Sequence, residues 1–250
     1  MKSLLKNIFL LGAVCITLSV SAQTGDDEYD YYTQQYSYGL MFQSKGWGVT
    51  FDYTQKMGKH HRVYDFDFVS LKHPKEVRII NGNYDSPPAY VFGKLNKAYA
   101  LRAGYGTKNY VGIKSNKTNI QLFGQLIGGP VIGFIKPVYL QIIKERTNSA
   151  GQTETIVENE RYNPEIHTNQ AAIYGESSFG NGLGQMSFKA GVFAKAAFGF
   201  EWGTYADEVR TLTFGVTVDA FTGKLPIMSK VENNAIFSTF FISFAYGNKN

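Results

Sequence analysis

Long stretches of alternating residues are the feature that most constrains the fold of this 250-residue chain. In 46–57, Trp47, Val49, Phe51 and Tyr53 fall on one face of an extended chain, and small or polar residues fall on the other. A period of two residues predicts β-strands, because a helix repeats every 3.6 residues or so. Further runs share the pattern: 62–71, 95–105, 186–201, 210–221 and 236–246.

These runs are longer than the strands of ordinary soluble proteins, which peak at about five or six residues. Crossing the hydrocarbon core of a bilayer at a tilt takes about 9–11 residues in β conformation. One face of each run is large and apolar, whereas the other mixes Gly, Ala, Thr and single charges. This pattern predicts an all-β fold, a transmembrane antiparallel β-barrel with an apolar outside and a narrow polar lumen. A soluble β-protein with aromatic core residues is the alternative that the pattern leaves open.

The composition excludes several other classes of protein. Aromatic residues make up 15% of the chain and charged residues only 18%, which argues against disorder. The 26 glycines argue against a coiled coil, and a single Cys excludes a disulfide scaffold.

The N-terminal residues have the features of a secretory signal peptide. Lys2 and Lys6 precede an apolar stretch over 8–20, and Ala22 ends a short run of small residues. We expect residues 1–22 to be cleaved, although a membrane anchor is the alternative. Cleavage removes Cys15 and lowers the net charge from +5 to +3, which gives no reason to expect nucleic acid as a partner.

Weaker alternating runs complete the predicted barrel: 36–43, 108–115, 118–127 and 131–144. The total is about ten strands, with a range of 8 to 12, and Pro137 marks an edge, bulge or bend in the last weak run. Tight periplasmic turns are expected at Gly58-Lys59, Gly106-Thr107 and Gly128-Gly129-Pro130, and a slightly longer one at 202–207. The two long excursions, 73–96 and 145–185, then fall together on the outer side. The predicted organisation is therefore a signal peptide (1–22), a periplasmic acidic and Tyr-rich segment (23–35) and a barrel (36–250).

Several short motifs resemble a family of uncharacterised outer-membrane β-barrel proteins of diderm bacteria. They are His73-Pro74-Lys75-Glu76, Val91-Phe92-Gly93-Lys94-Leu95-Asn96, Leu101-Arg102-Ala103-Gly104-Tyr105-Gly106, Ile135-Lys136-Pro137-Val138-Tyr139-Leu140 and Leu225-Pro226-Ile227-Met228. The resemblance covers nearly the whole mature chain. It implies an outer-membrane location and a barrel fold, and it carries no catalytic residues.

Charged residues on the inward face of the predicted strands are the main candidate site. We expect a lumen charge network of Asp52, Asp65, Asp67, Arg102, Lys189, Lys195, Glu201 and Asp219. Charges that leave bulk water must pair with one another or contact enclosed water. Three interpretations stay open: a salt-bridged filling of a narrow barrel, a hydrated conduit for small polar solutes, and a gated or ligand-linked network.

The histidines do not form a recognisable catalytic or metal-binding pattern. His60 and His61 lie in a predicted turn, without the carboxylate or Cys partners that a metal site needs. His73 and His167 lie in the two outer loops, where outer-membrane hydrolases carry their catalytic residues, but no motif accompanies them. We predict no catalytic residue, no metal and no cofactor.

The function that we expect is a structural or accessory role in an envelope assembly, such as a biogenesis or secretion complex. A narrow channel for small polar solutes and an enzyme at the barrel rim are the alternatives. The expected partners are outer-membrane lipid, the barrel-assembly machinery during insertion, and proteins of an envelope complex.

Overall fold

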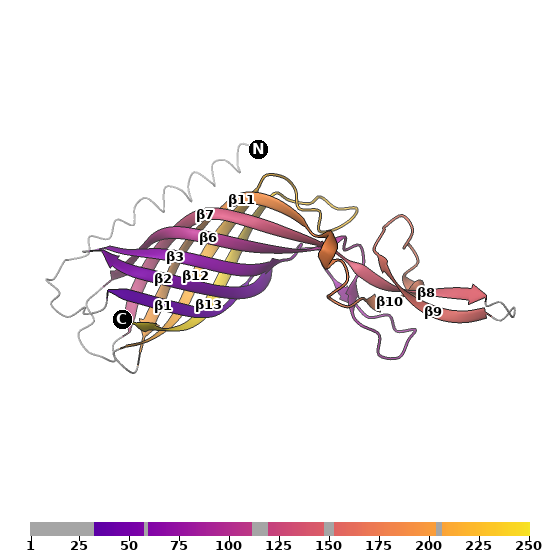
Figure 1. The fold of residues 1–250 in the computed structure, drawn as a ribbon, viewed down its shortest axis with the longest axis horizontal. Helices are drawn as coiled ribbons and strands as arrows, with labels where there is room; N and C mark the ends of the chain where they lie inside the picture. The colour runs from indigo at the N-terminus through magenta and orange to yellow at the C-terminus, as the bar shows by residue number, and fades with distance from the viewer. Residues whose placement is uncertain (1–32, 58–59, 112–119, 148–152, 204–206) are drawn as a thin grey trace.

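A computed structural model describes residues 33–57, 60–111, 120–147, 153–203 and 207–250. Eight antiparallel strands close into a barrel, in the spatial order β1-β13-β12-β11-β7-β6-β3-β2 (Figure 1). The strands are β1 (Gln34–Gln43), β2 (Gly46–Met57), β3 (His60–Leu71), β6 (Asn96–Val111), β7 (Gln121–Pro137), β11 (Ser187–Trp202), β12 (Glu208–Phe221) and β13 (Ile236–Lys249). The all-β prediction is confirmed.

The first and last strands close the barrel. β1 pairs with β13 from Gln35 opposite Lys249 to Gln43 opposite Phe241. Closure leaves no unpaired sheet edge around the barrel, so the backbone hydrogen bonds of these strands are satisfied internally. Among the described residues, no helix is long and apolar enough to cross a bilayer.

The predicted number of about ten strands is wrong, because two predicted turns are continuous strand. Gly106 lies inside β6, and the Gly128-Gly129-Pro130 segment lies inside β7. These glycines allow close approach of neighbouring backbones: a Cβ at Gly106 would come 2.0 Å from the carbonyl oxygen of Leu126. The β6–β7 pairing is interrupted opposite Gly129 and Pro130, where proline has no N–H to donate.

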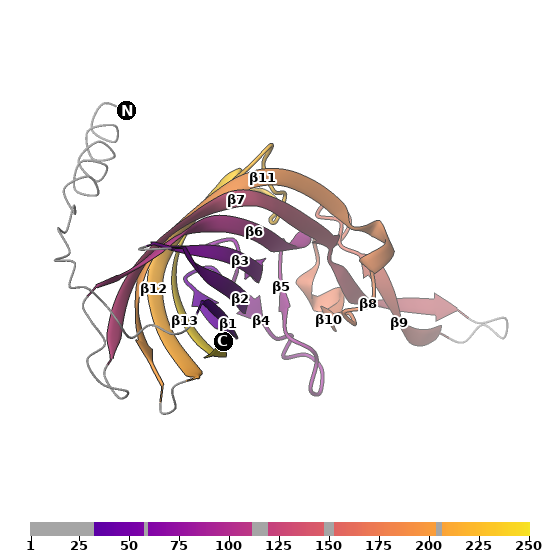
Figure 2. The same cartoon turned by 60° about the vertical axis from the view of Figure 1, so that its left-hand side comes forward.

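The predicted strand over 131–144 divides at Pro137. β7 ends there, and β8 (Tyr139–Thr147) leaves the barrel to form a three-stranded sheet in the order β10-β8-β9 (Figure 2). Its other strands are β9 (Thr153–Arg161) and β10 (Ile173–Glu176). Smaller elements are β4 (Arg78–Ile79), β5 (Tyr90–Val91), η1 (Gln170–Ala172) and η2 (Leu183–Gln185). We call the β10-β8-β9 sheet the projecting sheet.

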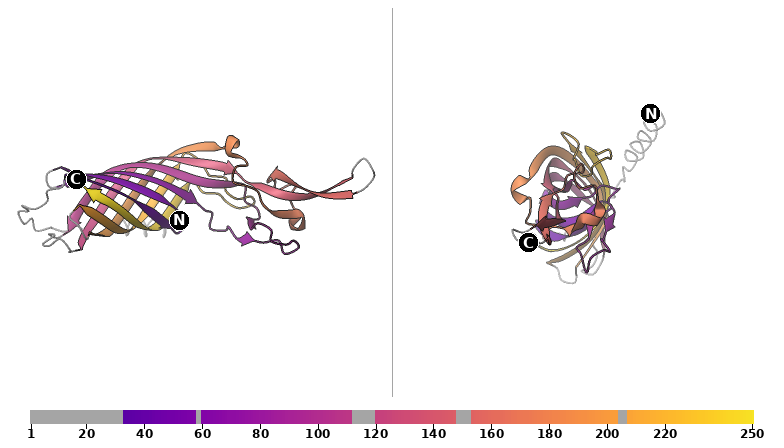
Figure 3. Two further views of the ribbon diagram at one scale, coloured as in Figure 1. Left: turned by 60° about the horizontal axis from the view of Figure 1, so that its bottom comes forward. Right: turned by 90° about the vertical axis from the view of Figure 1, so that its right-hand side faces the viewer.

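The two ends of the barrel differ strongly. The projecting sheet extends from one end, and the C-terminus lies at the other (Figures 1 and 3). Both long excursions of the chain lie at the projecting end, as expected from the sequence, although they contain short strands. Residues 1–22, most of 23–35, and the turns at Gly58-Lys59 and 204–206 lie outside the described residues.

The barrel is apolar on its outside. β13 alternates strictly between exposed and buried residues from Ile236 to Gly247. The exposed positions on the barrel strands are mostly large and apolar: Tyr38, Leu40, Phe42, Trp47, Val49, Phe51, Tyr64, Phe66, Phe68, Leu101, Tyr105, Leu122, Leu126, Ile132, Phe188, Val192, Phe198, Val218, Ile236, Phe240, Ile242, Phe244 and Tyr246. The buried positions include half of the charged residues of the barrel strands, among them Asp65, Arg102 and Glu201.

Candidate functional site

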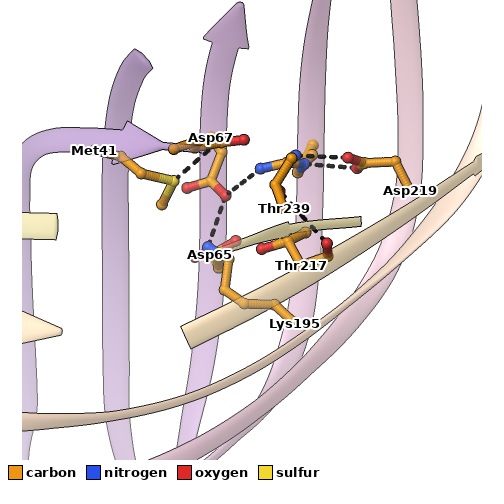
Figure 4. A network of polar contacts seen from close by, with 9 residues as sticks. Met41, Asp65, Asp67, Lys195, Thr217, Asp219 and Thr239 are labelled. Atoms are coloured by element: carbon orange, nitrogen blue, oxygen red, sulfur yellow. Dashed lines mark hydrogen bonds and ion pairs between the residues drawn. The ribbon is translucent and has the colours of Figure 1, made fainter. Parts of the chain in front are cut away.

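The centre of the lumen holds a network of buried ion pairs (Figure 4). Arg102 of β6 donates two hydrogen bonds of 2.7 Å to the carboxylate of Asp219 on β12, on the other side of the barrel. A third contact of 3.5 Å joins Arg102 to Asp67 of β3. All three side chains are 0% exposed. A bidentate Arg–carboxylate contact is strong and directional, so it fixes β6 against β12.

A lysine completes this central cluster. Lys195 of β11 lies 2.5 Å from Asp65 and 2.6 Å from Asp67, two carboxylates on the same inward face of β3. Together, Arg102 and Lys195 tie strands β3, β6, β11 and β12 across the lumen. The ring of Phe193 lies 6.0 Å from the Arg102 guanidinium and adds an apolar wall.

Carboxylates outnumber cations in this part of the lumen. Asp52 of β2 lies directly opposite Asp65 in the β2–β3 register. Asp52, Asp65 and Asp67 each carry one buried carboxylate oxygen that has no hydrogen-bond partner among the described residues. No group of three or more His, Cys, Asp or Glu with the geometry of a metal site is found among these residues.

A second charged cluster lies toward the end that holds the C-terminus. Glu201 of β11 accepts hydrogen bonds from Lys108 at 3.0 Å, from Lys249 at 2.5 Å and from the Tyr110 hydroxyl at 2.8 Å. Gln35 of β1 adds a fourth contact at 3.2 Å. This cluster joins β1, β6, β11 and β13, so it also bridges the barrel from wall to wall.

A cavity of about 20 Å³ adjoins the second cluster. Its lining includes Gln35, Tyr110 and Lys249. A volume of this size is close to what one water molecule needs.

The predicted residues thus divide into three groups. Asp65, Asp67, Arg102, Lys195 and Asp219 form the central cluster, with Asp52 beside it. Glu201 belongs to the second cluster. Lys189, also on β11, makes no ion pair with any residue that the structure describes.

Four members of the second cluster do not follow from the sequence prediction, and one of them, Gln35, falls in the predicted periplasmic segment 23–35. The sequence predicts a separate strand for Lys108 and Tyr110, because Gly106-Thr107 is expected to be a turn. Lys249 lies beyond the last predicted alternating run. A continuous alternation from Arg102 through Gly104 and Gly106 to Lys108 is the signal that would have placed Lys108 in the lumen.

The loop between β12 and β13 closes the projecting end of the barrel. Leu225, Ile227 and Met228 are buried in the same apolar core as the lumen residues Met41 and Leu71. We call residues 225–228 the plug. Its position does not follow from alternation, because it is an irregular segment.

Hydrogen bonds hold the plug in place. The backbone N–H groups of Leu95 and Asn96 donate to the carbonyl of Ile227, at 2.8 and 3.2 Å. The side-chain oxygen of Asn233 accepts from the N–H groups of Ile227 and Met228, at 2.9 and 3.0 Å. The irregular backbone of this segment therefore has partners at these positions although it is buried.

The projecting sheet has a polar patch of its own. His167 is buried, and its Nε2 lies 3.0 Å from a carboxylate oxygen of Glu160 on β9. Lys144 of β8 also donates to Glu160, and these two hydrogen bonds hold the pKa of Glu160 below its ordinary value. An open pocket of about 190 Å³ lies here, with Ile142 and Ile173 among its lining.

The other outer-loop residues with catalytic potential have separate partners. His73 Nε2 lies 3.2 Å from the backbone carbonyl of Glu232. Ser177 donates a 2.7 Å hydrogen bond to the Asn159 side chain. None of the contacts of His73, His167 and Ser177 joins a histidine to a serine, so the described contacts do not assemble a hydrolase-type pair.

The fold and the lumen define a class: a closed, antiparallel, eight-stranded β-barrel with an apolar outside and a filled lumen. No protein-family model matches the sequence, and a search of curated proteins finds no match.

Two solved structures show some similarity to the chain. The crystal structure of Neisserial surface protein A (NspA) is 8% identical, with a TM-score of 0.39, and the match covers 86% of this chain and 94% of that one. The crystal structure of Ail, the attachment invasion locus protein of Yersinia pestis, is 10% identical, with a TM-score of 0.38, and the match covers 87% and 97%. Values this low carry no argument, so nothing about function is transferred from either protein.

Proposed function

We propose that this chain is an integral outer-membrane β-barrel protein with a structural or accessory role in an envelope assembly, and that the projecting sheet is its contact surface. The observation that carries the proposal is a filled barrel joined to a sheet that extends beyond its end. The proposal assigns no catalytic role to the chain.

The outer surface of the barrel supports insertion into a membrane. Large apolar side chains such as Phe198 and Phe240 point away from the barrel, where water would be a poor solvent for them. Contiguous exposed apolar surface of this extent is rare on soluble monomers. A closed barrel is the one β architecture that satisfies its backbone hydrogen bonds in lipid, and the predicted signal peptide fits export to the outer membrane.

The filled lumen supports a role other than transport. Two wall-to-wall clusters, centred on Arg102 and Glu201, occupy the interior, and the plug covers the projecting end. A barrel of about eight strands has an interior that side chains can fill completely. A conduit for polar solutes would require these ion pairs and the plug to separate.

The projecting sheet supports a contact role. The spatial order β10-β8-β9 leaves one edge of β9 and one edge of β10 unpaired within the sheet. Unpaired sheet edges can accept an added strand from another protein. A small apolar core of Tyr90, Leu140, Ile142, Tyr162 and Ile173 supports the sheet, so the surface has a rigid base.

The test is a pull-down from mild detergent with the tagged chain and a variant that lacks most of the β8–β9 hairpin. Ile142 and Glu158 are register partners, so replacing residues 143–157 with Asn-Gly joins the strands through a tight turn. We expect the full chain to co-purify with a stoichiometric envelope protein, and the shortened chain to lose it while keeping the heat-dependent gel shift of a folded barrel.

Two results would contradict this proposal. If the full chain purifies alone, or if the shortened chain retains the same partner, the projecting sheet is not the contact surface. Planar-bilayer recordings are a separate experiment. A steady conductance from the folded chain would favour a channel over a contact role.

A further inference from the structure

Two lysines lie directly opposite each other at the projecting end of the barrel. Lys97 of β6 and Lys136 of β7 are register partners, and the next pair on the same sheet face is Tyr99 and Phe134. Like charges directly across a strand pair destabilise a sheet. An anion close to both lysines would offset this repulsion.

Only one of the two lysines has an ion pair within the described structure. Lys97 forms a salt bridge with Glu176 of β10. Lys136 makes no hydrogen bond or ion pair with a described residue, although it is only 3% exposed. Its ammonium lies 5.0 Å from the centre of the Phe179 ring, and that of Lys97 lies 5.9 Å from the same ring. Glu176 also acts on the ammonium of Lys136, so this one carboxylate is shared between two lysines, and a bound anion would balance the second positive charge.

An aromatic cluster lies immediately below the lysines on the outer surface. Phe68 stacks on Tyr99 at 5.8 Å and contacts Phe134 at 6.4 Å, and Phe134 contacts Phe188 at 5.2 Å. Aromatic residues on membrane barrels collect at the level of the lipid headgroups. The lysines lie one residue pair further along the strands, away from the middle of the barrel.

We propose that Lys97 and Lys136 bind the phosphate group of an anionic lipid in the leaflet at the projecting end, with the acyl chains of that lipid lying along Phe134 and Phe188. The inference rests on the proposed function, because it requires the barrel to lie in a membrane. The two ammonium groups supply donors and positive charge that Glu176 neutralises only in part. Phe179 covers one side of the site.

The test measures lipid retained by the mature, folded chain in a zwitterionic detergent, using native mass spectrometry. The probes are phosphatidic acid, phosphatidylcholine and inorganic phosphate. We expect phosphatidic acid to bind to the wild type, and Lys136→Gln to weaken that binding about tenfold or more, the loss of one charge-assisted contact. Lys144→Gln is the matched control, since Lys144 lies on the projecting sheet and already pairs with Glu158 and Glu160.

Three results would overturn the proposed lipid site. Equal retention of phosphatidic acid by Lys136→Gln and the wild type would overturn it, as would equal binding of phosphatidic acid and phosphatidylcholine. Competition by inorganic phosphate at the same concentration as the lipid would identify a free-phosphate site instead. Carbonate washing of vesicles tests the proposed function separately: a barrel that stays in the vesicles but shows no lipid preference refutes only this site.

Discussion

Replacing Arg102 with Met tests whether the central cluster holds the barrel together. The substitution removes the two 2.7 Å hydrogen bonds to Asp219 and the 3.5 Å contact with Asp67, while it keeps a side chain of similar length. Both carboxylates are fully buried, so neither can turn to bulk water. Breaking a buried pair by removing one partner costs about 3–5 kcal/mol, and we expect Arg102→Met to lower the free energy of unfolding by that amount.

The assay is urea unfolding of the barrel in lipid vesicles, followed by tryptophan fluorescence and by the heat-dependent shift on gels. Arg210→Met is the matched control, because Arg210 pairs with Glu208 on the same strand as Asp219 but is 39% exposed. We expect that control to change stability by about 1 kcal/mol or less. The double variant Arg102→Met/Asp219→Leu removes both partners and should recover most of the loss. A loss below about 1 kcal/mol for Arg102→Met would refute the reasoning.

Three further changes test other parts of the structure. Gly104→Val places a Cβ 2.5 Å from the Ile127 side chain, and we expect it to cost about 1–3 kcal/mol in the same assay, whereas Gly180→Val, with open space around it, should cost little. Ala196→Arg on the outer face of β11 should lower stability in vesicles by about 2–4 kcal/mol, whereas Ile166→Arg beyond the barrel should not. The lowered pKa of Glu160 means that its contribution to the β8–β9 hairpin is present above the ordinary carboxyl pKa and is lost as the pH falls through the lowered value. The protection factors of the hairpin amides, which correct for the slower intrinsic exchange in acid, should therefore fall as the pH is lowered for the wild type but not for Glu160→Gln, and the same fall in both chains would contradict this.

Much of the barrel follows from the alternation of apolar and polar residues alone, because each strand has one apolar outer face and one interior face. The runs at 46–57 and 210–221 match β2 and β12 to within two residues at each end. The predicted number of strands is wrong because some glycines lie within strands, where they allow close packing of neighbouring backbones, and not in turns. At Gly106 and Gly129 the neighbouring backbone leaves no room for a Cβ, and no single sequence distinguishes that use of glycine from a turn.

The candidate site was predictable only in part, for a related reason. Inward positions such as Asp67, Arg102 and Asp219 follow from their place in the alternation. Their pairing does not, since it depends on strand register and on which strands lie across the lumen from each other. The plug was missed because Leu225 and Ile227 lie in an irregular loop, where burial comes from tertiary hydrogen bonds rather than from a repeating pattern.

The central claim is that the outer face of the barrel contacts lipid, and the most direct test measures whether labels on that face are quenched by lipid. Single cysteines at Ala196, Thr217 and Ile166 would each carry a fluorophore in vesicles made with brominated lipid, in the mature chain without Cys15. The account predicts strong quenching at position 196, on the outer face, and little at 166, on the segment beyond the barrel. Position 217 faces the lumen and should be labelled poorly in the folded chain. An unquenched label at position 196, at the level of the label at 166, would contradict a lipid-facing barrel.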